Sequence, residues 1–191
     1  MIVLFDVDGV LVSAGHFGSW LQSEHQLSQE ETSRFFRGPF KSCSTGEADL
    51  LTVIEPFLRS WGIPESAEEV VARWFEMDGE PLANGASLFD EVAAMGVQMG
   101  IATTQEAHRK RHLINHIDRI RKCDFHFVSC DLGHVKPEPD YYRKINEQLQ
   151  QPVLFFDDVE ANVTAAREAG WEAYHYRGET SLADFGIRSL G

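Results

Sequence analysis

Basic residues are scarce in this chain of 191 residues, and long hydrophobic runs are absent. Lysine and arginine total 17 against 30 aspartates and glutamates, so the formal net charge is -13. Nucleic-acid binding normally depends on clusters of lysine and arginine, and we therefore expect no nucleic-acid partner. No apolar stretch approaches the ~18 residues that a membrane-spanning helix requires, so we expect no membrane partner either.

Cysteine is also rare, since only Cys43, Cys123 and Cys130 occur, and no two of them have CxxC spacing. An odd number of widely spaced cysteines predicts neither a zinc site nor a disulfide framework, so we expect buried or half-buried free thiols. The apolar run that begins at Ile2 leaves no room for a signal peptide before Asp6. Together these features favour a cytoplasmic location.

Four short apolar runs lie along the chain, and each is followed by residues that can hold a phosphoryl group or a divalent metal. They are residues 2–5 before Asp6 and Asp8, 97–102 before Thr103 and Thr104, 125–130 before Lys136, and 153–156 before Asp157 and Asp158. In an open sheet of parallel strands, ligands bind in the crevice beyond the carboxyl ends of the strands. This order therefore predicts one site at that edge of a sheet.

The spacing of apolar residues predicts an α/β fold with a doubly wound parallel sheet. The four runs lack period-two alternation, which is typical of strands covered on both faces. Segments between them have helical spacing, so strand and helix alternate and the crossovers should be right-handed. A last strand is predicted near residues 174–176, followed by a short helix and a tail over 181–191.

Residues 14–81 interrupt this alternation with a helical insert. Ser28 with Glu31 and Ser66 with Glu69 fit the capping box that begins a helix. An apolar stripe over 50–61 predicts a third helix, with a kink or a break at Pro56. We therefore predict a core domain of residues 1–13 and 82–191 and a cap domain of residues 14–81, with hinges near 12–15 and 79–85.

The carboxylates at two strand ends favour a divalent cation. Asp6 and Asp8 lie two residues apart, and Asp157 and Asp158 form a second close pair. Mg²⁺ prefers hard oxygen ligands and is commonly held by one or two carboxylates together with substrate phosphate. A carboxylate can also attack phosphorus to form an aspartyl-phosphate, provided that the site supplies positive charge, for which Lys136 is suitable.

These positions resemble the haloacid dehalogenase-like superfamily of phosphohydrolases, whose four motifs occur in order along most of the chain. The motifs are Asp6-Val7-Asp8-Gly9-Val10-Leu11, Gly100-Ile101-Ala102-Thr103, Lys136-Pro137-Glu138-Pro139 and Asp157-Asp158-Val159-Glu160-Ala161-Asn162. The resemblance implies a Rossmann-like core with a small helical cap, and Mg²⁺ as the cofactor.

The same resemblance implies catalytic and metal-binding roles. Asp6 is the expected nucleophile, and Asp8 is the expected general acid and base. The expected metal ligands are the carboxylates of Asp6 and Asp158 and the backbone carbonyl of Asp8, with Asp157 supporting the metal without binding it.

Phosphoryl binding is expected from Thr103 and Lys136, with Thr104 as an additional contact. The segment Cys130-Asp131-Leu132-Gly133, with Lys136-Pro137 and Tyr141-Tyr142, is similar to glucose-1-phosphate phosphatases and to the phosphatase domain of epoxide hydrolases. The resemblance thus implies hydrolysis of a small phosphorylated metabolite, with a sugar phosphate as the expected substrate.

Other functions remain as alternatives. True haloacid dehalogenases lack the second aspartate, so the presence of Asp8 favours phosphoryl transfer. A phosphomutase of the β-phosphoglucomutase type would share all four motifs. A receiver-type signalling module or a catalytically silent binding module could also use this fold, but the long helical insert disfavours the first and the complete set of motifs disfavours the second.

Several residues outside the motifs carry weaker signals. His108, His112 and His116, with the basic residues 109–111 among them, predict an exposed basic helix rather than a metal site. The aromatic residues of the insert predict a hydrophobic core of the cap, with Phe40 the best candidate to face the substrate. Arg37 or Lys41 could read a polar tail of the substrate, although solvent exposure is the alternative for each.

Overall fold

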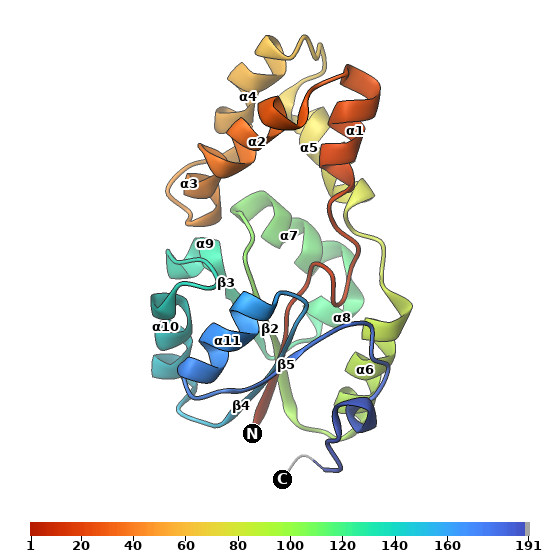
Figure 1. Cartoon of the computed structure of the whole chain (residues 1–191), viewed down its shortest axis with the longest axis vertical. Coiled ribbons are helices and arrows are strands. Elements are labelled where there is room, and N and C mark those ends of the chain that lie inside the picture. Colours follow the sequence, from red (N-terminus) through yellow and green to blue (C-terminus); the bar gives the residue numbers. More distant parts are fainter. Residues whose placement is uncertain (190–191) are drawn as a thin grey trace.

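The computed structural model describes residues 1–189 and contains one parallel sheet with a separate group of helices beyond its upper edge (Figure 1). The strands are β1 (Ile2–Phe5), β2 (Gln98–Thr103), β3 (Phe125–Val128), β4 (Val153–Asp157) and β5 (Glu172–His175), in the order β3-β2-β1-β4-β5. The central strand is β1, so Asp6 emerges at the middle of the carboxyl edge. Predicted tail residues 190–191 lie outside the described residues.

Side chains that alternate along β1 pack on two different layers, although all four of its residues are 0% exposed. Val3 and Phe5 belong to one hydrophobic cluster, and Ile2 and Leu4 belong to the other. The first face is covered by α6 (Ala83–Ala94), α7 (Ala107–His116), α8 (Asp118–Arg121) and the short 3-10 helix Leu182–Phe185. The second face is covered by α10 (Pro139–Leu149) and α11 (Glu160–Glu168). Burial on both faces explains why the strands read as continuous apolar runs.

The inserted residues form five helices with a hydrophobic cluster of their own. These are α1 (His16–His25), α2 (Gln29–Arg37), α3 (Phe40–Ser44), α4 (Leu50–Ser60) and α5 (Ala67–Met77). Both predicted capping boxes are present, with Ser28 and Ser66 each accepting a hydrogen bond from the backbone of the glutamate three residues later. The predicted fold class, an α/β core with an inserted helical cap, is confirmed.

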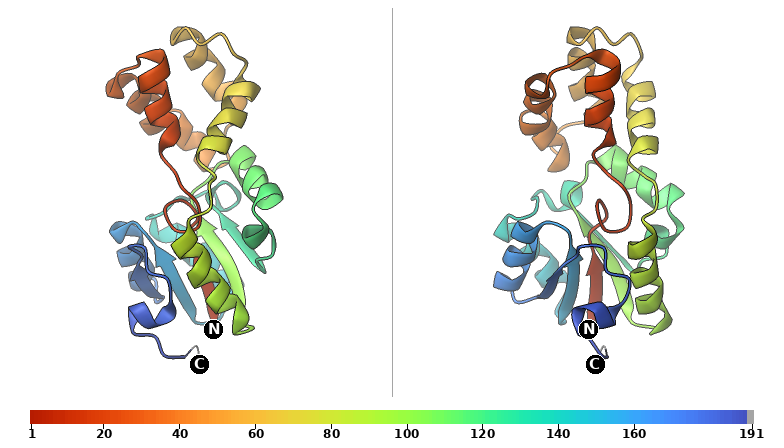
Figure 2. Two further views of the ribbon diagram at one scale, coloured as in Figure 1. Left: turned by 90° about the vertical axis from the view of Figure 1, so that its right-hand side faces the viewer. Right: turned by 45° about the vertical axis from the view of Figure 1, so that its right-hand side comes forward.

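Two connections join the cap to the core, and they run side by side (Figure 2). Val12 pairs with Pro81, the backbone N–H of Ser13 donates to the carbonyl of Glu80 at 2.8 Å, and the N–H of Leu82 donates to that of Leu11 at 3.0 Å. The domain limits of 1–13 and 82–191 for the core and 14–81 for the cap remain a proposal. This pairing supports placing both boundaries at the same point in space.

Several predicted boundaries differ from the observed ones. The third strand ends at Val128 rather than at residue 130, because residues 129–132 turn into the short helix α9 (Ser129–Leu132). The helix α4 continues through Pro56, so the break allowed by the sequence does not occur. The last strand covers Glu172–His175 instead of 174–176.

The second predicted hinge includes Gly85, but this residue lies within α6. A Cβ at this position would lie 1.7 Å from the carbonyl oxygen of Val10, so glycine is required for α6 to approach the loop after β1. None of the described helices is long and apolar enough to cross a membrane. Cys43 and Cys123 are buried and Cys130 is half-buried, and all three are free thiols, as predicted.

Candidate active site

The loop after β1 begins with a buried carboxylate. Asp6 is 7% exposed, and its Oδ1 accepts a hydrogen bond from the backbone N–H of Val7 at 2.7 Å. The loop then turns at Gly9, whose φ is +78° and whose Cβ, if it had one, would lie 2.2 Å from Oδ2 of Asp158. A glycine is therefore needed both for the left-handed turn and for the close approach of this loop to the loop after β4.

Lys136 joins the carboxylates that follow two neighbouring strands. Its side chain is 2% exposed, and its Nζ lies 2.8 Å from Oδ1 of Asp6 and 2.5 Å from Oδ2 of Asp157. Asp157 is 0% exposed and also accepts hydrogen bonds from Asn162 Nδ2 at 3.0 and 3.1 Å. Two buried carboxylates thus share one ammonium, and the group carries a net charge of -1 when all three are ionised.

Burial and the neighbouring opposite charges shift the pKa values of Asp6 and Lys136 in opposite directions. Burial raises the pKa of Asp6 to about 7, while the attraction of Lys136 lowers it and the repulsion of Asp157 raises it. Burial alone would lower the pKa of Lys136, but the two carboxylates outweigh it and raise that pKa. Lys136 therefore stays charged, and the ionised form of Asp6 is favoured by any further positive charge at the site.

The donor set beside Lys136 suits a hard divalent cation. Carboxylate oxygens of Asp6, Asp157 and Asp158 lie within 4.8 Å of one another. Asp157 is already bound to Lys136 and Asn162, whereas the half-buried carboxylate of Asp158 forms no ion pair with any residue from 1 to 189. Asp6 uses only its Oδ1 for Lys136 and the backbone N–H of Val7, so its Oδ2 and the carboxylate of Asp158 can bind such an ion, and Mg²⁺ commonly needs only one or two carboxylates.

The carboxylate of Asp8 points away from this group and toward the cap. Its Oδ2 accepts a hydrogen bond from Gln105 Nε2 at 2.8 Å, and its Oδ1 lies 3.4 Å from Arg109 Nη2. Burial raises the pKa of Asp8, while Arg109 and Gln105 oppose the rise. A side-chain carboxylate in this position does not join the cation-binding oxygens, and its raised pKa suits a proton donor.

The end of β2 supplies hydroxyl groups beside the same loops. Thr103 is 1% exposed, and its Oγ1 accepts a hydrogen bond from Gln105 Nε2 at 3.3 Å. Thr104 Oγ1 accepts one from the backbone N–H of Lys136 at 3.2 Å. One cavity of about 510 Å³ is lined by every predicted site residue except the buried Asp157, namely Asp6, Asp8, Thr103, Thr104, Lys136 and Asp158.

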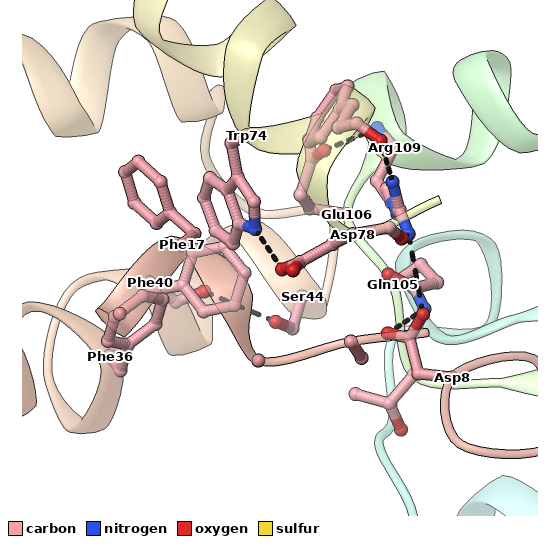
Figure 3. Close-up of a pocket in the computed structure, with 15 residues that line it drawn as sticks. Asp8, Phe17, Phe36, Phe40, Ser44, Trp74, Asp78, Gln105, Glu106 and Arg109 are labelled. Atoms are coloured by element: carbon pink, nitrogen blue, oxygen red, sulfur yellow. Dashed lines mark hydrogen bonds and ion pairs between the residues drawn. The ribbon is translucent and has the colours of Figure 1, made fainter. Parts of the chain in front are cut away.

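A second cavity, of about 290 Å³, lies between the core and the cap (Figure 3). It shares Asp8, Ala14, Thr104 and Gln105 with the first cavity, so the two adjoin at these residues. Its cap side is mostly aromatic and is lined by Phe17, Phe36, Phe40, Trp74, Phe75 and Asp78. Asp8 therefore stands between a charged cavity in the core and an aromatic cavity under the cap.

The buried side chain of Arg109 contradicts the prediction of an exposed basic helix over 108–116. It is 4% exposed, donates from Nη1 to the carbonyl of Phe75 at 2.9 Å, and donates from Nη2 to the carbonyl of Asp78. It is thus bound to the end of cap helix α5 as well as to Asp8. The sequence signal for its burial is Leu113, four residues later on the same face of α7 and 1% exposed.

The histidines of α7 serve different purposes. His108 Nε2 lies 2.6 Å from Oδ2 of Asp49, the N-cap residue of α4 in the cap, so this pair links the two parts of the chain. The rings of His112 and His116 stack with centroids 4.4 Å apart. The only group of possible metal ligands found among the described residues contains no histidine.

Of the cap residues considered from sequence, Phe40 lines the aromatic cavity, whereas Arg37 and Lys41 line neither cavity. Lys41 is exposed and its Nζ lies 3.7 Å from Oε1 of the half-buried Glu138. The aromatic side chains predicted to form the cap core do so, but Phe36, Phe40 and Trp74 are only partly buried and also face the cavity.

Comparison with known proteins gives one family match. A sequence model described as haloacid dehalogenase-like hydrolase matches residues 1–170. This range includes all four motifs and the whole helical insert.

Solved structures with the same fold cover nearly the whole chain. A HAD family enzyme from Bacteroides thetaiotaomicron, solved in complex with magnesium and inorganic phosphate, has a TM-score of 0.78 at 15% identity, covering 96% of this chain and 98% of that one. A HAD-like family hydrolase from Porphyromonas gingivalis has a TM-score of 0.77 at 18% identity, with coverages of 97% and 95%. The L-2-haloacid dehalogenase from Xanthobacter autotrophicus has a TM-score of 0.63 at 19% identity, with coverages of 90% and 75%. At these identities the likeness shows the fold.

Proposed function

This chain belongs to the haloacid dehalogenase-like hydrolases, and on that premise we propose that it is a Mg²⁺-dependent phosphatase of small phosphomonoesters. The observation that carries the proposal is the placement of two aspartates of one loop against different partners. Asp6 is held by Lys136 in the charged cavity, whereas Asp8 is held by Gln105 and Arg109 toward the second cavity, and burial raises the pKa of both carboxyls. Such a pair suits a nucleophile and a proton donor on either side of one phosphorus atom.

In the proposed reaction, Asp6 attacks the phosphorus of the ester and forms an aspartyl-phosphate. The anionic carboxylate approaches an anionic ester, so positive charge and oriented donors must offset their repulsion. Lys136 supplies a fixed ammonium, and the hydroxyls of Thr103 and Thr104 are the proposed contacts to the phosphoryl oxygens. The bound cation would be held by the carboxylates of Asp6 and Asp158 and the backbone carbonyl of Asp8, and would supply further charge neutralisation. Mg²⁺ is the ion bound in the related enzyme from Bacteroides thetaiotaomicron, together with inorganic phosphate.

Asp8 completes the reaction by moving a proton. The leaving group of an alkyl phosphate is a basic alkoxide, so cleavage of the bond between phosphorus and the ester oxygen is accelerated when a neutral acid donates a proton to that oxygen. Asp8 then has the ionised form that can accept a proton from the water that hydrolyses the aspartyl-phosphate. A halide needs no such proton, which is why Asp8 favours a phosphatase over a dehalogenase.

The proposal is tested by identifying the phosphorylated residue. The enzyme is mixed with excess phosphomonoester and Mg²⁺, quenched in acid within milliseconds, and treated with borohydride, which reduces an acyl phosphate to an alcohol. Mass spectrometry should then find homoserine at residue 6. Turnover with no modification at that position, or with modification at another residue, would contradict the proposal.

The same preparation separates hydrolysis from transfer. A phosphatase releases one inorganic phosphate for each ester consumed, whereas a phosphomutase consumes ester without releasing phosphate. Full activity in the presence of EDTA would contradict the proposed dependence on Mg²⁺.

A further inference from the structure

The cavity under the cap has an aromatic wall held in a fixed arrangement. Trp74 stacks on Phe17 with ring centroids 4.3 Å apart and planes 9° apart, and Phe40 lies 5.5 Å from Trp74. Phe36 stands nearly perpendicular to Trp74, at 86° and 5.7 Å. Figure 3 shows these rings gathered on the cap side of the cavity, opposite Asp8. Aromatic faces carry partial negative charge and attract cations.

A buried carboxylate lies beside these rings. Asp78 is 6% exposed, its Oδ2 accepts a hydrogen bond from Trp74 Nε1 at 2.8 Å, and its Oδ1 accepts one from the backbone N–H of His16 at 2.7 Å. Both donors are neutral and both oxygens act as acceptors, which is the behaviour of an ionised carboxylate. The same hydrogen bond fixes the indole ring of Trp74 against the carboxylate.

Positive charge is deficient in this cavity. Glu106 is a second buried carboxylate in its lining, at 2% exposed, and it accepts hydrogen bonds from the backbone N–H groups of His108 and Arg109. Arg109 is the only lysine or arginine that lines the cavity, and its guanidinium is bound to Asp8 and to two backbone carbonyls. Within residues 1–189, neither Asp78 nor Glu106 has a lysine or arginine side chain at ion-pair distance. Arg109 attracts both carboxylates from beyond ion-pair distance, so their charge is only partly compensated, and a cationic ligand would add to that compensation.

We propose that the leaving group of the natural substrate carries an ammonium, so that the substrate is the phosphate ester of an amino alcohol. The phosphoryl group binds in the charged cavity beside Asp6, the ester oxygen lies near Asp8, and the ammonium lies between the aromatic rings and Asp78. This inference rests on the phosphatase function proposed above and adds its substrate class.

A cationic group fits this cavity better than the sugar expected from the sequence. A sugar presents several hydroxyls that each need a donor and an acceptor when they are buried. Most side-chain donors here are already used, since Gln105 binds Asp8 and Thr103, Arg109 binds backbone carbonyls, and the hydroxyl of Ser44 donates to the carbonyl of Phe40 at 3.3 Å. The hydroxyl of Thr104 also lines the cavity, and it is the proposed contact to the phosphoryl group. An ammonium needs only acceptors and aromatic faces, both of which the cavity provides.

The test compares two substrates of equal shape and different charge. Phosphocholine and 3,3-dimethylbutyl phosphate differ only in a quaternary nitrogen in place of a quaternary carbon. With the full-length enzyme and Mg²⁺, kcat/KM for phosphocholine should exceed that of the neutral isostere by about tenfold or more. It should also exceed that of glucose 1-phosphate, while p-nitrophenyl phosphate reports whether the enzyme is a phosphatase at all.

Variants locate the source of the preference. The substitution Asp78→Asn should reduce the ratio of kcat/KM between the two isosteres several-fold toward 1, because it removes the charge that favours the cation. Glu76→Gln is the matched control, since Glu76 is an exposed acid on the same helix, α5, and lies outside both cavities. Its ratio should equal that of the wild type. Circular dichroism checks that both variants fold.

Every other outcome contradicts either the inferred substrate class or the proposed phosphatase function. Equal kcat/KM for the two isosteres would indicate an apolar pocket without preference for charge, and a higher value for glucose 1-phosphate would restore the sugar phosphate; either overturns the inference. Hydrolysis of p-nitrophenyl phosphate alone would also overturn it and leave the phosphatase function standing. No hydrolysis of any of the four esters would instead refute the proposed function.

Discussion

The two walls of the proposed active site consist of different kinds of side chain. The core wall consists of charged and hydroxyl side chains at the ends of buried strands, with Lys136 held between Asp6 and Asp157. The cap wall consists of aromatic rings from helices, with Asp78 as its main charged group. The side chains of the core wall suit one kind of reaction. The side chains of the cap wall can change without altering that reaction. We infer that chemistry resides in the core and that the choice of leaving group resides in the cap, with Asp8 and Arg109 between them.

Removing Asp6, the proposed nucleophile, should have the largest effect on activity. Asp6→Asn should reduce kcat for p-nitrophenyl phosphate by at least about 10⁴-fold, because an amide cannot form the acyl phosphate. The control is Asp140→Asn, which removes an exposed carboxylate on α10 and should leave kcat unchanged. An Asp6→Asn variant with more than a tenth of wild-type kcat would mean that the core wall does not perform the chemistry in the way proposed.

Removing Asp8, the proposed proton donor, should have an effect that depends on the leaving group. Asp8→Asn should slow hydrolysis of alkyl phosphates by about 10²–10⁴-fold, the usual contribution of general acid catalysis. Hydrolysis of p-nitrophenyl phosphate should slow less, since nitrophenolate is stable without a proton. If steady-state kinetics showed the same loss for both esters, Asp8 would have a role other than proton donation.

Displacing the cap should affect binding more than chemistry. Gly46 follows α3 in the cap, and a Cβ there would lie 2.2 Å from the carbonyl oxygen of Cys130 in the core. We expect Gly46→Ala to push the two walls apart and raise KM by about tenfold, corresponding to ~1.4 kcal/mol of lost binding. Gly62→Ala is the matched control, because Gly62 has a similar φ of +70° against +77°, and a Cβ added there would meet no atom within 4 Å. Equal KM values for the two variants would mean that this contact does not hold the cap in place.

The smallest expected effect is the change in the free energy of unfolding with pH that the ionisation of Asp6 causes. The pKa of Asp6 is raised from 3.8 to about 7, so in this interval the folded protein binds more protons than the unfolded chain. The free energy of unfolding must therefore fall as pH rises from about 4 to 7, and Asp6→Asn should remove this fall. By differential scanning calorimetry in EDTA at pH near 8, the variant should melt a few degrees above the wild type, since ~1 kcal/mol shifts Tm by roughly 2–4 °C in a chain of this size. A lower Tm for the variant would show that the charge of Asp6 stabilises the core instead of straining it.

The core wall could be predicted from sequence because its geometry follows from local rules. A buried parallel strand delivers the next residues to one edge of the sheet, so Asp6, Thr103 and Asp157 are placed by strand ends alone. Their proposed catalytic roles remain predictions. The third strand ends earlier than predicted, because the prediction extended the apolar run through Ser129 and Cys130. In the structure the hydroxyl of Ser129 donates to the carbonyl of Ser44 in the cap at 2.6 Å.

The cap wall could not be predicted in the same way because it depends on contacts between distant segments. Arg109 is turned inward by carbonyls at the end of α5, and its position in a basic run gives little sign of this. Asp78 lies just beyond a helix end, where an exposed acid would be the ordinary expectation. The hydrogen bond from Trp74, four residues earlier, is local, but the bond from the backbone N–H of His16 forms only because α1 packs against α5.

The paired connections at Val12 and Pro81 have a consequence for engineering and for evolution. The insert leaves and re-enters the rest of the molecule at adjacent points, so its excision would leave a gap that a short turn could close. Grafting the corresponding segment of a relative between these two positions should therefore need no rebuilding of the sheet. A lineage of such enzymes could acquire new substrates by exchanging this one module while the reaction itself stayed the same.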